Sequence, residues 1–416
     1  MNGLTSRIKM PVLKFLMIFL GITMGIRPLY GQQFRFKDHR MVQRIAFSML
    51  KNLIVIPVYI DGKGPFRFIL DTGVGPMIIT DPSLIDSLQL KNLRSIKIAG
   101  LGKGEPVEAF VSNQLTATVG DAEYPQIPTA ILKEDLFNLS SYLGTHIHGL
   151  MGYHFFKSFI VEIRYTSRRI IFYDPLYRRK IKGTRIPLNI IGDKPYAKVS
   201  IRFDGQPALP ISVLIDNGAS HAISLEKLGD EPFPAPEKTI AANLGVGLSG
   251  VIDGRMGRAA SLQIGNYTLN NVLSSFPDFH DVVNKILIRD RSGNLGADVL
   301  SRFNTTYDYG DSAVYLKKNH TFRRPFQHDM AGMEITAEGP DLNHFIIGRI
   351  EPDSPADEAM LLKDDEIVSI DFSSVSRYSL TELNEIFRNG HRKLLLVTVI
   401  RSGQRLTMLL KLKQRI

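Results

Sequence analysis

The sequence predicts an all-β protein made of two homologous lobes and a smaller third module. Short runs rich in β-branched and aromatic residues alternate with Gly and Pro, which is typical of strands joined by turns. An internal repeat with an offset of 145 residues indicates two related lobes. The 416 residues are enough for two to three domains, and the 44% hydrophobic content is that of a globular protein.

Residues 1–31 have the pattern of a secretory signal peptide. Three basic residues precede twelve uncharged, mostly apolar residues at 15–26, a length that fits an h-region and is short for a membrane span. Gly31 is a small residue at which cleavage is expected. We therefore expect an exported protein, in the periplasm or outside the cell; an uncleaved leader would instead anchor it to a membrane.

The net charge of +10 lies partly in this leader, which holds four basic residues and no acid, so the rest of the chain carries +6. The main basic run, residues 168–185, contains strand-like apolar residues. We interpret it as a solvated linker between the lobes, with contact to an anionic surface as the alternative. No nucleic-acid-binding motif is evident, so we expect no nucleic acid partner. The chain has no cysteine, which excludes disulfides and thiolate chemistry.

Each lobe should begin with a β-hairpin. The stretch LIVIPVYIDGKGPFRFIL places two β-rich runs around an Asp-Gly turn at 61–62. The stretch AKVSIRFDGQPALPISVLI repeats this arrangement around 204–205. Only short helices are expected, such as one at 82–88.

The internal repeat consists of an acidic turn followed by three further elements in the same order. FRFILDTGVGPMIIT and ISVLIDNGASHAIS each place an acid, Asp71 or Asp216, at the end of an apolar run. The later anchors are residues 99–102 with 244–247, 119–120 with 264–265, and Gly152 with Gly296. We expect the lobes at residues 40–175 and 185–320. A carboxylate is costly to bury, so two of them in matching contexts indicate a shared role.

With these elements the sequence resembles the pepsin/retropepsin family of aspartic proteases, in which two β lobes each supply one Asp from an Asp-Thr/Ser-Gly turn. The resemblance covers about residues 45–317. It implies a single-chain, bilobal β fold, hydrolysis of peptide bonds in polypeptide substrates, and no cofactor or metal. The matching pieces are ILDTG, LIDNG, the glycine-rich segments, Leu150-Met151-Gly152 and Asn294-Leu295-Gly296.

The resemblance implies that Asp71 and Asp216 are the catalytic residues. Two carboxyls about 3 Å apart cannot both ionise, so they share one proton. The ionised group would take a proton from water while the protonated group donates to the substrate carbonyl. Gly73 and Gly218 would let the two turns approach closely, and Thr72 would brace the opposite lobe through its hydroxyl.

The resemblance also implies that the glycine-rich segments form flap hairpins over the cleft. The flap candidates are Gly100, Gly102, Lys103, Gly245 and Gly247.

Two asparagines depart from the family pattern. Asn217 replaces the Thr or Ser of the second turn, so the symmetric hydroxyl brace is lost or altered. Asn294 stands where the family prefers an apolar residue.

Residues 321–416 resemble a bacterial-type PDZ domain, a β fold with short helices. PDSPADEAMLLKDDEIVSID is the most specific piece, although Met360 and Asp364 replace the usual glycines. The resemblance implies that the domain binds C-terminal peptides by β-augmentation and so recruits substrates or regulates access to the cleft. The loop for the peptide carboxylate would consist of Asp329, Met330, Ala331, Gly332 and Met333.

Other motifs give weaker indications. His146 and His148 have a spacing that suits a metal, but no third ligand is tied to them, so we expect a structural role. GLGKG and LGVGLSG lack the Lys-Ser/Thr ending of a phosphate loop. The competing function is a catalytically weak or inactive protein that binds peptides with the cleft and the PDZ groove.

The residues after each Asp-Xaa-Gly predict a rate optimum in the weakly acidic to neutral range, about pH 5 to 7. Many acid-acting relatives have a Thr or Ser there, whose hydroxyl favours the charged carboxylate. Val74 and Ala219 have no side-chain donor. The dyad should therefore keep its shared proton to higher pH.

Overall fold

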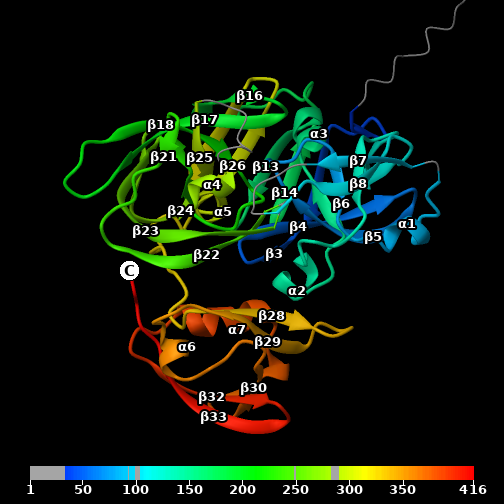
Figure 1. The fold of residues 1–416 in the computed structure, drawn as a ribbon. Coiled ribbons are helices and arrows are strands. Elements are labelled where there is room, and N and C mark those ends of the chain that lie inside the picture. Colours follow the sequence, from blue (N-terminus) through cyan, green and yellow to red (C-terminus); the bar gives the residue numbers. More distant parts are fainter. Residues whose placement is uncertain (1–32, 92, 99–103, 248–249, 283–289) are drawn as a thin grey trace, which may run out of the picture. The chain divides into compact units, whose positions relative to one another are not determined.

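The computed structural model describes residues 33–416 except 92, 99–103, 248–249 and 283–289. The expected leader lies outside the described residues. The described chain is predominantly β with short helices, as the sequence predicts (Figure 1). No helix in the described part is long and apolar enough to cross a membrane.

Lobe one is built on an 11-stranded sheet with the order β1-β10-β9-β4-β5-β12-β6-β11-β8-β7, and β3 pairs with β4. The predicted first hairpin is β4–β5, whose strands pair antiparallel. The strands are β1 (Arg35–Phe36), β3 (Ser48–Leu50), β4 (Leu53–Ile60), β5 (Lys63–Leu70), β6 (Met77–Ile79), β7 (Arg94–Ile98), β8 (Val107–Ser112), β9 (Ala117–Val119), β10 (Ala122–Tyr124), β11 (Thr129–Leu132) and β12 (Gly149–Met151).

Lobe two repeats this plan in an eight-stranded sheet with the order β16-β17-β18-β25-β19-β24-β23-β22, in which β17 also pairs with β23. Strands β20 and β21, which follow β19 in the sequence, pair with each other in a separate two-stranded sheet. The strands are β16 (Asn189–Ile191), β17 (Lys194–Arg202), β18 (Leu209–Ile215), β19 (Ile223–Leu225), β20 (Lys227–Leu228), β21 (Glu231–Pro232), β22 (Thr239–Gly247), β23 (Gly250–Ile264), β24 (Tyr267–Pro277) and β25 (Arg291–Leu295).

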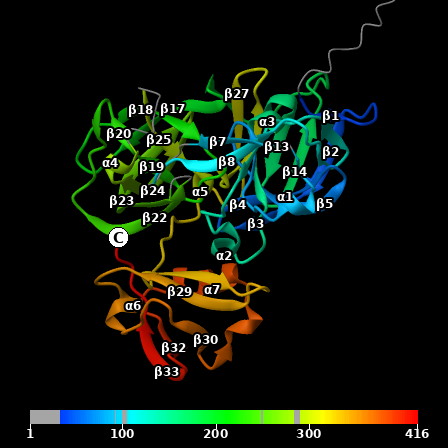
Figure 2. The ribbon, with the colours of Figure 1, turned by 45° about the vertical axis from the view of Figure 1, so that its right-hand side comes forward.

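A six-stranded sheet with the order β15-β27-β26-β13-β14-β2 joins the lobes (Figure 2). The joint is the antiparallel pair β13–β26, in which Val161 lies opposite Tyr307. The basic run 168–185 contributes strands to this sheet. The strands are β2 (Val42–Ala46), β13 (Ile160–Arg164), β14 (Arg169–Tyr173), β15 (Thr184–Pro187), β26 (Phe303–Asp308) and β27 (Ala313–Lys318).

The helices of the lobes are short. The predicted helix at 82–88 is α1. The others connect strands. Helices α3 and α5 each follow the glycine that ends a repeated element of the family pattern, Gly152 in lobe one and Gly296 in lobe two. The helices are α1 (Leu84–Ser87), α2 (Leu139–Leu143), α3 (Tyr153–Ser158), α4 (Phe279–Val282) and α5 (Ala297–Leu300).

One hydrophobic cluster contains buried residues of both lobes. At its centre the ring of Phe156 packs on Tyr307, with centroids 4.9 Å apart, so lobe one and lobe two share a core beneath the common sheet. Burying one such aromatic side chain stabilises the fold by about 1.5–3 kcal/mol. The two lobes are therefore expected to unfold together.

The third module has its own hydrophobic cluster. Its sheet has the order β28-β29-β30-β32-β33, with β31 paired to β30. Helix α7 begins with a capping box between Ser379 and Glu382. The elements are β28 (Met333–Glu338), β29 (His344–Ile350), α6 (Pro355–Glu358), β30 (Glu366–Ile370), β31 (Ser373–Ser374), the 3₁₀ helix η2 (Val375–Arg377), α7 (Leu380–Arg388), β32 (Leu394–Arg401) and β33 (Gln404–Lys411). We call this set the PDZ-like module.

The segment between lobe two and the module packs on the lobes. Phe326 belongs to the lobe cluster, and Phe322 packs against it. The Arg302 guanidinium lies over the Phe326 ring, 3.5 Å from its centroid. Residues 321–326 therefore complete the core of lobe two.

Truncation can test whether residues 321–326 belong to the core of lobe two. A chain that ends at Gln327 should retain the thermal stability of the lobes, whereas a chain that ends at His320 should lose both phenylalanines and melt at a lower temperature. Removing a buried Phe side chain costs about 3–5 kcal/mol. Differential scanning calorimetry gives both melting temperatures, and equal values for the two chains would contradict the packing role of Phe322 and Phe326.

Candidate active site

The two acids occupy equivalent places in the two lobes. Asp71 directly follows β5 and its N–H donates to Met151 O at 2.8 Å. Asp216 directly follows β18 and its N–H donates to Leu295 O at 2.9 Å. In each lobe the strand that leads into the acid, β5 or β18, pairs in parallel with the strand before Gly152 or Gly296, β12 or β25. The sequence repeat thus produces two matching acidic turns.

Glycines make the close packing around these turns possible. A Cβ on Gly152 would collide with Asp71 O, and a Cβ on Gly296 would collide with His221 O. A Cβ on Gly218 would collide with the Asp71 carboxyl group itself. Any side chain at these three positions would therefore force the turns apart.

The carboxyl groups of Asp71 and Asp216 lie close together: a Cβ on Gly73 would be 3.0 Å from Asp71 Oδ1 and 3.3 Å from Asp216 Oδ1. They are almost buried, with 8% and 9% of their surfaces exposed. Gly73 N donates to Asp71 Oδ1 at 2.6 Å, and Gly218 N donates to Asp216 Oδ1 at 2.9 Å. The structure thus brings together the two acids and the two glycines that the sequence indicates.

The pair holds a proton at neutral pH. Burial, followed by the negative charge of Asp216, raises the pKa of Asp71 to about 8. The Gly73 N–H and the charge of Lys194 act in the opposite direction and are weaker. One protonated and one ionised carboxyl are what general acid–base chemistry on a peptide bond needs.

The brace between the two turns is one-sided. Thr72 Oγ1 donates to Ile215 O at 2.6 Å and accepts from Asn217 N at 3.0 Å, so lobe one reaches lobe two. The Asn217 side chain does not return the contact: its Oδ1 accepts from the hydroxyls of Tyr307 at 2.8 Å and Tyr165 at 3.4 Å. Asn217 Nδ2 has no hydrogen-bond partner among the described residues.

Two hairpins lead to the predicted flap segments. In lobe one, β7 pairs with β8; the candidates Gly100, Gly102 and Lys103 lie outside the described residues. In lobe two, β22 pairs with β23, and a bulge at Gly245 is held by a 3.0 Å bond from its N–H to Asn243 Oδ1. Gly247 pairs with Gly250 at the end of that ladder. A Cβ on Gly250 would lie 3.8 Å from Gly104 N, so the two hairpin ends meet.

The two histidines with metal-like spacing have separate structural partners. His148 Nδ1 accepts from Arg67 N at 3.1 Å and its ring packs on Phe66. His146 Nε2 lies 3.2 Å from Pro340 O. In the part of the chain that the structure describes, no group of three or more potential ligands could hold a metal ion.

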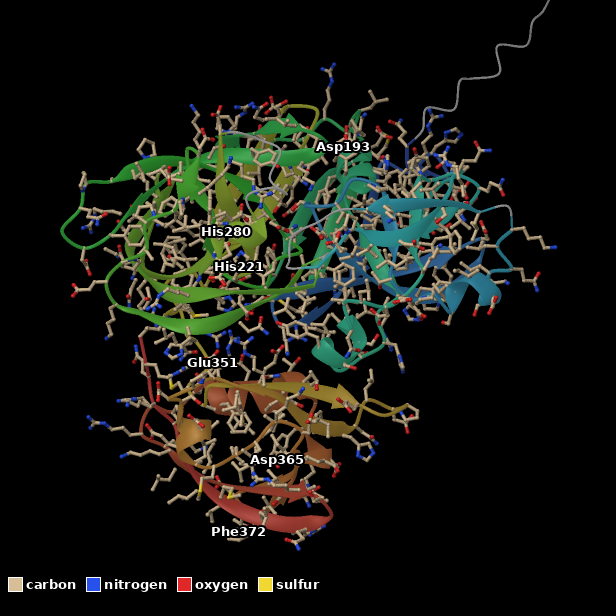
Figure 3. All side chains as sticks on the ribbon, in the orientation of Figure 1. Asp193, His221, His280, Glu351, Asp365 and Phe372 are labelled. Carbon is tan, nitrogen blue, oxygen red and sulfur yellow. The ribbon has the colours of Figure 1, made fainter. Side chains whose placement is uncertain are left out.

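Sequence reasoning missed two polar residues at the dyad. Asn294 was noted as a departure but was given no role; its Nδ2 donates to Asp216 Oδ2 at 3.0 Å. His221, which is labelled in Figure 3, carried no signal of its own. Its Nε2 lies 2.8 Å from Asn294 Oδ1. A polar residue in a position expected to be apolar was the only available signal.

In the PDZ-like module, the loop expected to bind a peptide carboxylate precedes β28. The five candidate residues are together, but the Asp329 side chain is turned onto the loop. Its Oδ2 accepts from Gly332 N and, at 3.2 Å, from Met333 N. Burial raises the pKa of Asp329 to about 6.

Comparison with known proteins supports the resemblance of lobe one to aspartic proteases. Residues 56–155 match the sequence model of the family described as "Aspartyl protease". This part of the chain is similar to that family, and it holds Asp71. No curated protein matches the chain.

Two solved structures show partial similarity. A photosystem II D1 C-terminal processing protease is 23% identical, with 21% of this chain and 23% of that chain covered and a TM-score of 0.20. The HtrA3 PDZ domain bound to a phage-derived ligand is 18% identical, with 21% of this chain and 86% of that chain covered and a TM-score of 0.19.

The electrostatics of the dyad can be measured without a substrate. The Asp71 carboxyl should titrate near pH 8, and Asp216→Asn should lower its pKa because the neighbouring charge is removed while the burial remains. Carboxyl ¹³C NMR of the labelled protein follows both. An unchanged Asp71 titration in Asp216→Asn would show that the two groups do not interact.

Proposed function

We propose that the protein is an aspartic endopeptidase that hydrolyses peptide bonds in polypeptide substrates. The observation that carries the proposal is the buried, closely placed pair of Asp71 and Asp216, delivered by equivalent turns of two lobes. The family match of residues 56–155 supports it independently. The leader pattern supports export to the periplasm or the extracellular space.

The reaction proceeds without a covalent intermediate. The ionised carboxylate of the pair removes a proton from a water molecule, which attacks the scissile carbonyl carbon. The protonated carboxyl donates its proton to the carbonyl oxygen, so a neutral tetrahedral diol forms. When the diol collapses, the protonated carboxyl donates its proton to the leaving nitrogen and the ionised carboxylate accepts the proton of one diol hydroxyl. The C–N bond breaks, a carboxylic acid and an amine leave, and the pair again holds one proton.

The PDZ-like module is proposed to recruit chains with suitable C-termini or to regulate access to the cleft. Contacts with the lobe-two flap hairpin support regulation. Asn243 Nδ2 in β22 donates to Glu334 Oε2 in β28 at 2.9 Å, and Arg349 in β29 forms a 2.7 Å ion pair with Asp253 in β23. A ligand that displaces β28 or β29 would therefore act on the flap directly.

The alternative is a catalytically weak or inactive protein that binds peptides. The altered brace favours it, because Asn217 turns toward Tyr307 and leaves one buried amide group without a partner among the described residues. Such a protein would keep the cleft and lose turnover.

Cleavage of unfolded casein decides between the two. Asp71→Asn and Asp216→Asn should each lower kcat/KM by about 10²- to 10⁴-fold, because each removes one half of the acid–base pair. The kcat/KM of the double variant should be no lower than that of the less active single variant, since the two groups act as a unit.

Asp204→Asn, at an exposed hairpin turn, is the matched control and should cleave normally. Substantial activity in either dyad variant would contradict the shared mechanism and point to a dimer that pairs like lobes. Binding of casein peptides by the wild type without cut products would favour the binding protein.

A further inference from the structure

The two members of the dyad have different hydrogen-bond environments. Asp216 accepts from Gly218 N at Oδ1 and from Asn294 Nδ2 at Oδ2, so both of its oxygens receive protein donors. The position equivalent to Asn294 in lobe one is Leu150, whose side chain has no donor to offer Asp71. The repeat is therefore broken at one position that touches the dyad.

His221 fixes the orientation of the Asn294 amide. His221 immediately precedes the segment that leads into β19, and β19 pairs antiparallel with β25, which carries Asn294. The 2.8 Å contact joins His221 Nε2 to Asn294 Oδ1. Because an amide oxygen only accepts, His221 Nε2 must carry the proton and donate. Reversal of the amide would place its oxygen against the Asp216 carboxylate, which is unfavourable.

We propose that Asn294, oriented by His221, is a positioning residue that assigns the ionised role to Asp216 and the shared proton to Asp71. Two N–H donors on one carboxylate favour its charged form. In the free enzyme Asp216 is then the general base that activates water, and Asp71 is the general acid. This inference rests on the proposed function and specifies which carboxyl performs which step.

Other charged groups near the dyad do not replace this donor. Lys194, in β17, acts on Asp71 through its charge. Arg291, in β25, is paired at 2.6 Å with Glu226, which follows β19, and also contacts Tyr196. All of them remain when Asn294 is changed, so a variant at Asn294 isolates its own effect.

Asn294→Leu copies the lobe-one residue and keeps the number and branching of the side-chain heavy atoms. Without the donor, the ionised form of the dyad is less stabilised, so the acid limb of the kcat/KM profile should move up by about one pH unit and activity on that limb should fall about tenfold. His221→Leu should shift the limb in the same direction, and His221→Gln, which keeps a donor, should restore part of it. Leu150→Met is the volume-conserving control and should leave the limb in place.

Thermal unfolding of each variant excludes loss of fold as the cause. An equal loss of kcat/KM at every pH would show a purely structural role and overturn the proposal. Carboxyl ¹³C NMR provides the same test without turnover: the dyad should take up its second proton at higher pH in Asn294→Leu than in the wild type. If the wild type cleaves nothing, the proposed function fails, and this titration still decides the role of Asn294.

A second, independent observation concerns the PDZ-like module. The amides of Gly332 and Met333, which the resemblance assigns to a peptide carboxylate, already bind the half-buried Asp329 carboxylate. The groove between β28 and α7 is also covered. A Cβ on Gly144, which ends α2 of lobe one, would lie 2.7 Å from Leu380 Cβ in α7.

Further contacts extend this cover. His146 Nε2 lies 3.2 Å from Pro340 O, just beyond β28. Tyr142 of α2 lies beside Glu334 of β28 and Arg388 of α7, and all three line one cavity. The Lys51 ammonium lies 3.7 Å from the centroid of the Tyr142 ring.

We infer that the module is occupied by its own chain: Asp329 substitutes for a ligand's C-terminal carboxylate, and α2 covers the groove. A C-terminal peptide must displace both. Displacement of α2 would free the module from lobe one, which links ligand binding to the proposed regulation of the cleft.

Fluorescence anisotropy with a peptide that ends in a free apolar carboxyl residue tests this inference in the full chain. Asp329→Ala should bind this peptide at least about tenfold more tightly than the wild type, whereas the C-terminally amidated peptide should show no gain. Asp341→Ala, at an exposed position, is the control and should bind like the wild type. Equal affinity in wild type and Asp329→Ala, or no binding by a folded Asp329→Ala, would overturn the inference.

Discussion

The contact between two buried carboxyl groups is the constraint on which the rest of the structure depends. Removing an ion from water costs several kcal/mol even after relaxation. Asp71 and Asp216 avoid a second such cost because they share one proton. Parallel strand pairs, close packing at glycines such as Gly218, and the Thr72 brace hold the two turns together. The site therefore exists only when both lobes are folded on their common sheet.

Behind the dyad the two lobes solve the same packing problem with different chemistry. In lobe one the face that contains Leu150 is an apolar cluster. In lobe two the corresponding strand carries Asn294 and the buried Arg291, which is paired with Glu226. Loss of one partner of a buried ion pair typically costs 3–5 kcal/mol, so this polar face is tightly specified. The lobes are equivalent in backbone and distinct in electrostatic environment.

The sequence predicted the β fold, the two lobes and the acidic turns because each depends on local patterns that recur along the chain. It could not predict contacts between side chains far apart in the sequence. The rotation of Asn217 toward Tyr307 joins residues 90 apart, and the bond from Asn294 to Asp216 joins residues 78 apart. The fold of Asp329 onto its own loop was also invisible, since the same residues were compatible with an open loop. The packing of Phe326 on the lobes was missed because the change of sequence pattern comes before it.

The presence of both lobes in one polypeptide has an evolutionary consequence. In a symmetric dimer of identical lobes, every substitution occurs on both sides of the two-fold axis, so neither acid can acquire a neighbour that the other lacks. Duplication within one chain removes that restriction. Leu150 and Asn294, at equivalent positions of the two lobes, are such a difference. The proposed division of labour between the two acids therefore requires two lobes that differ in sequence.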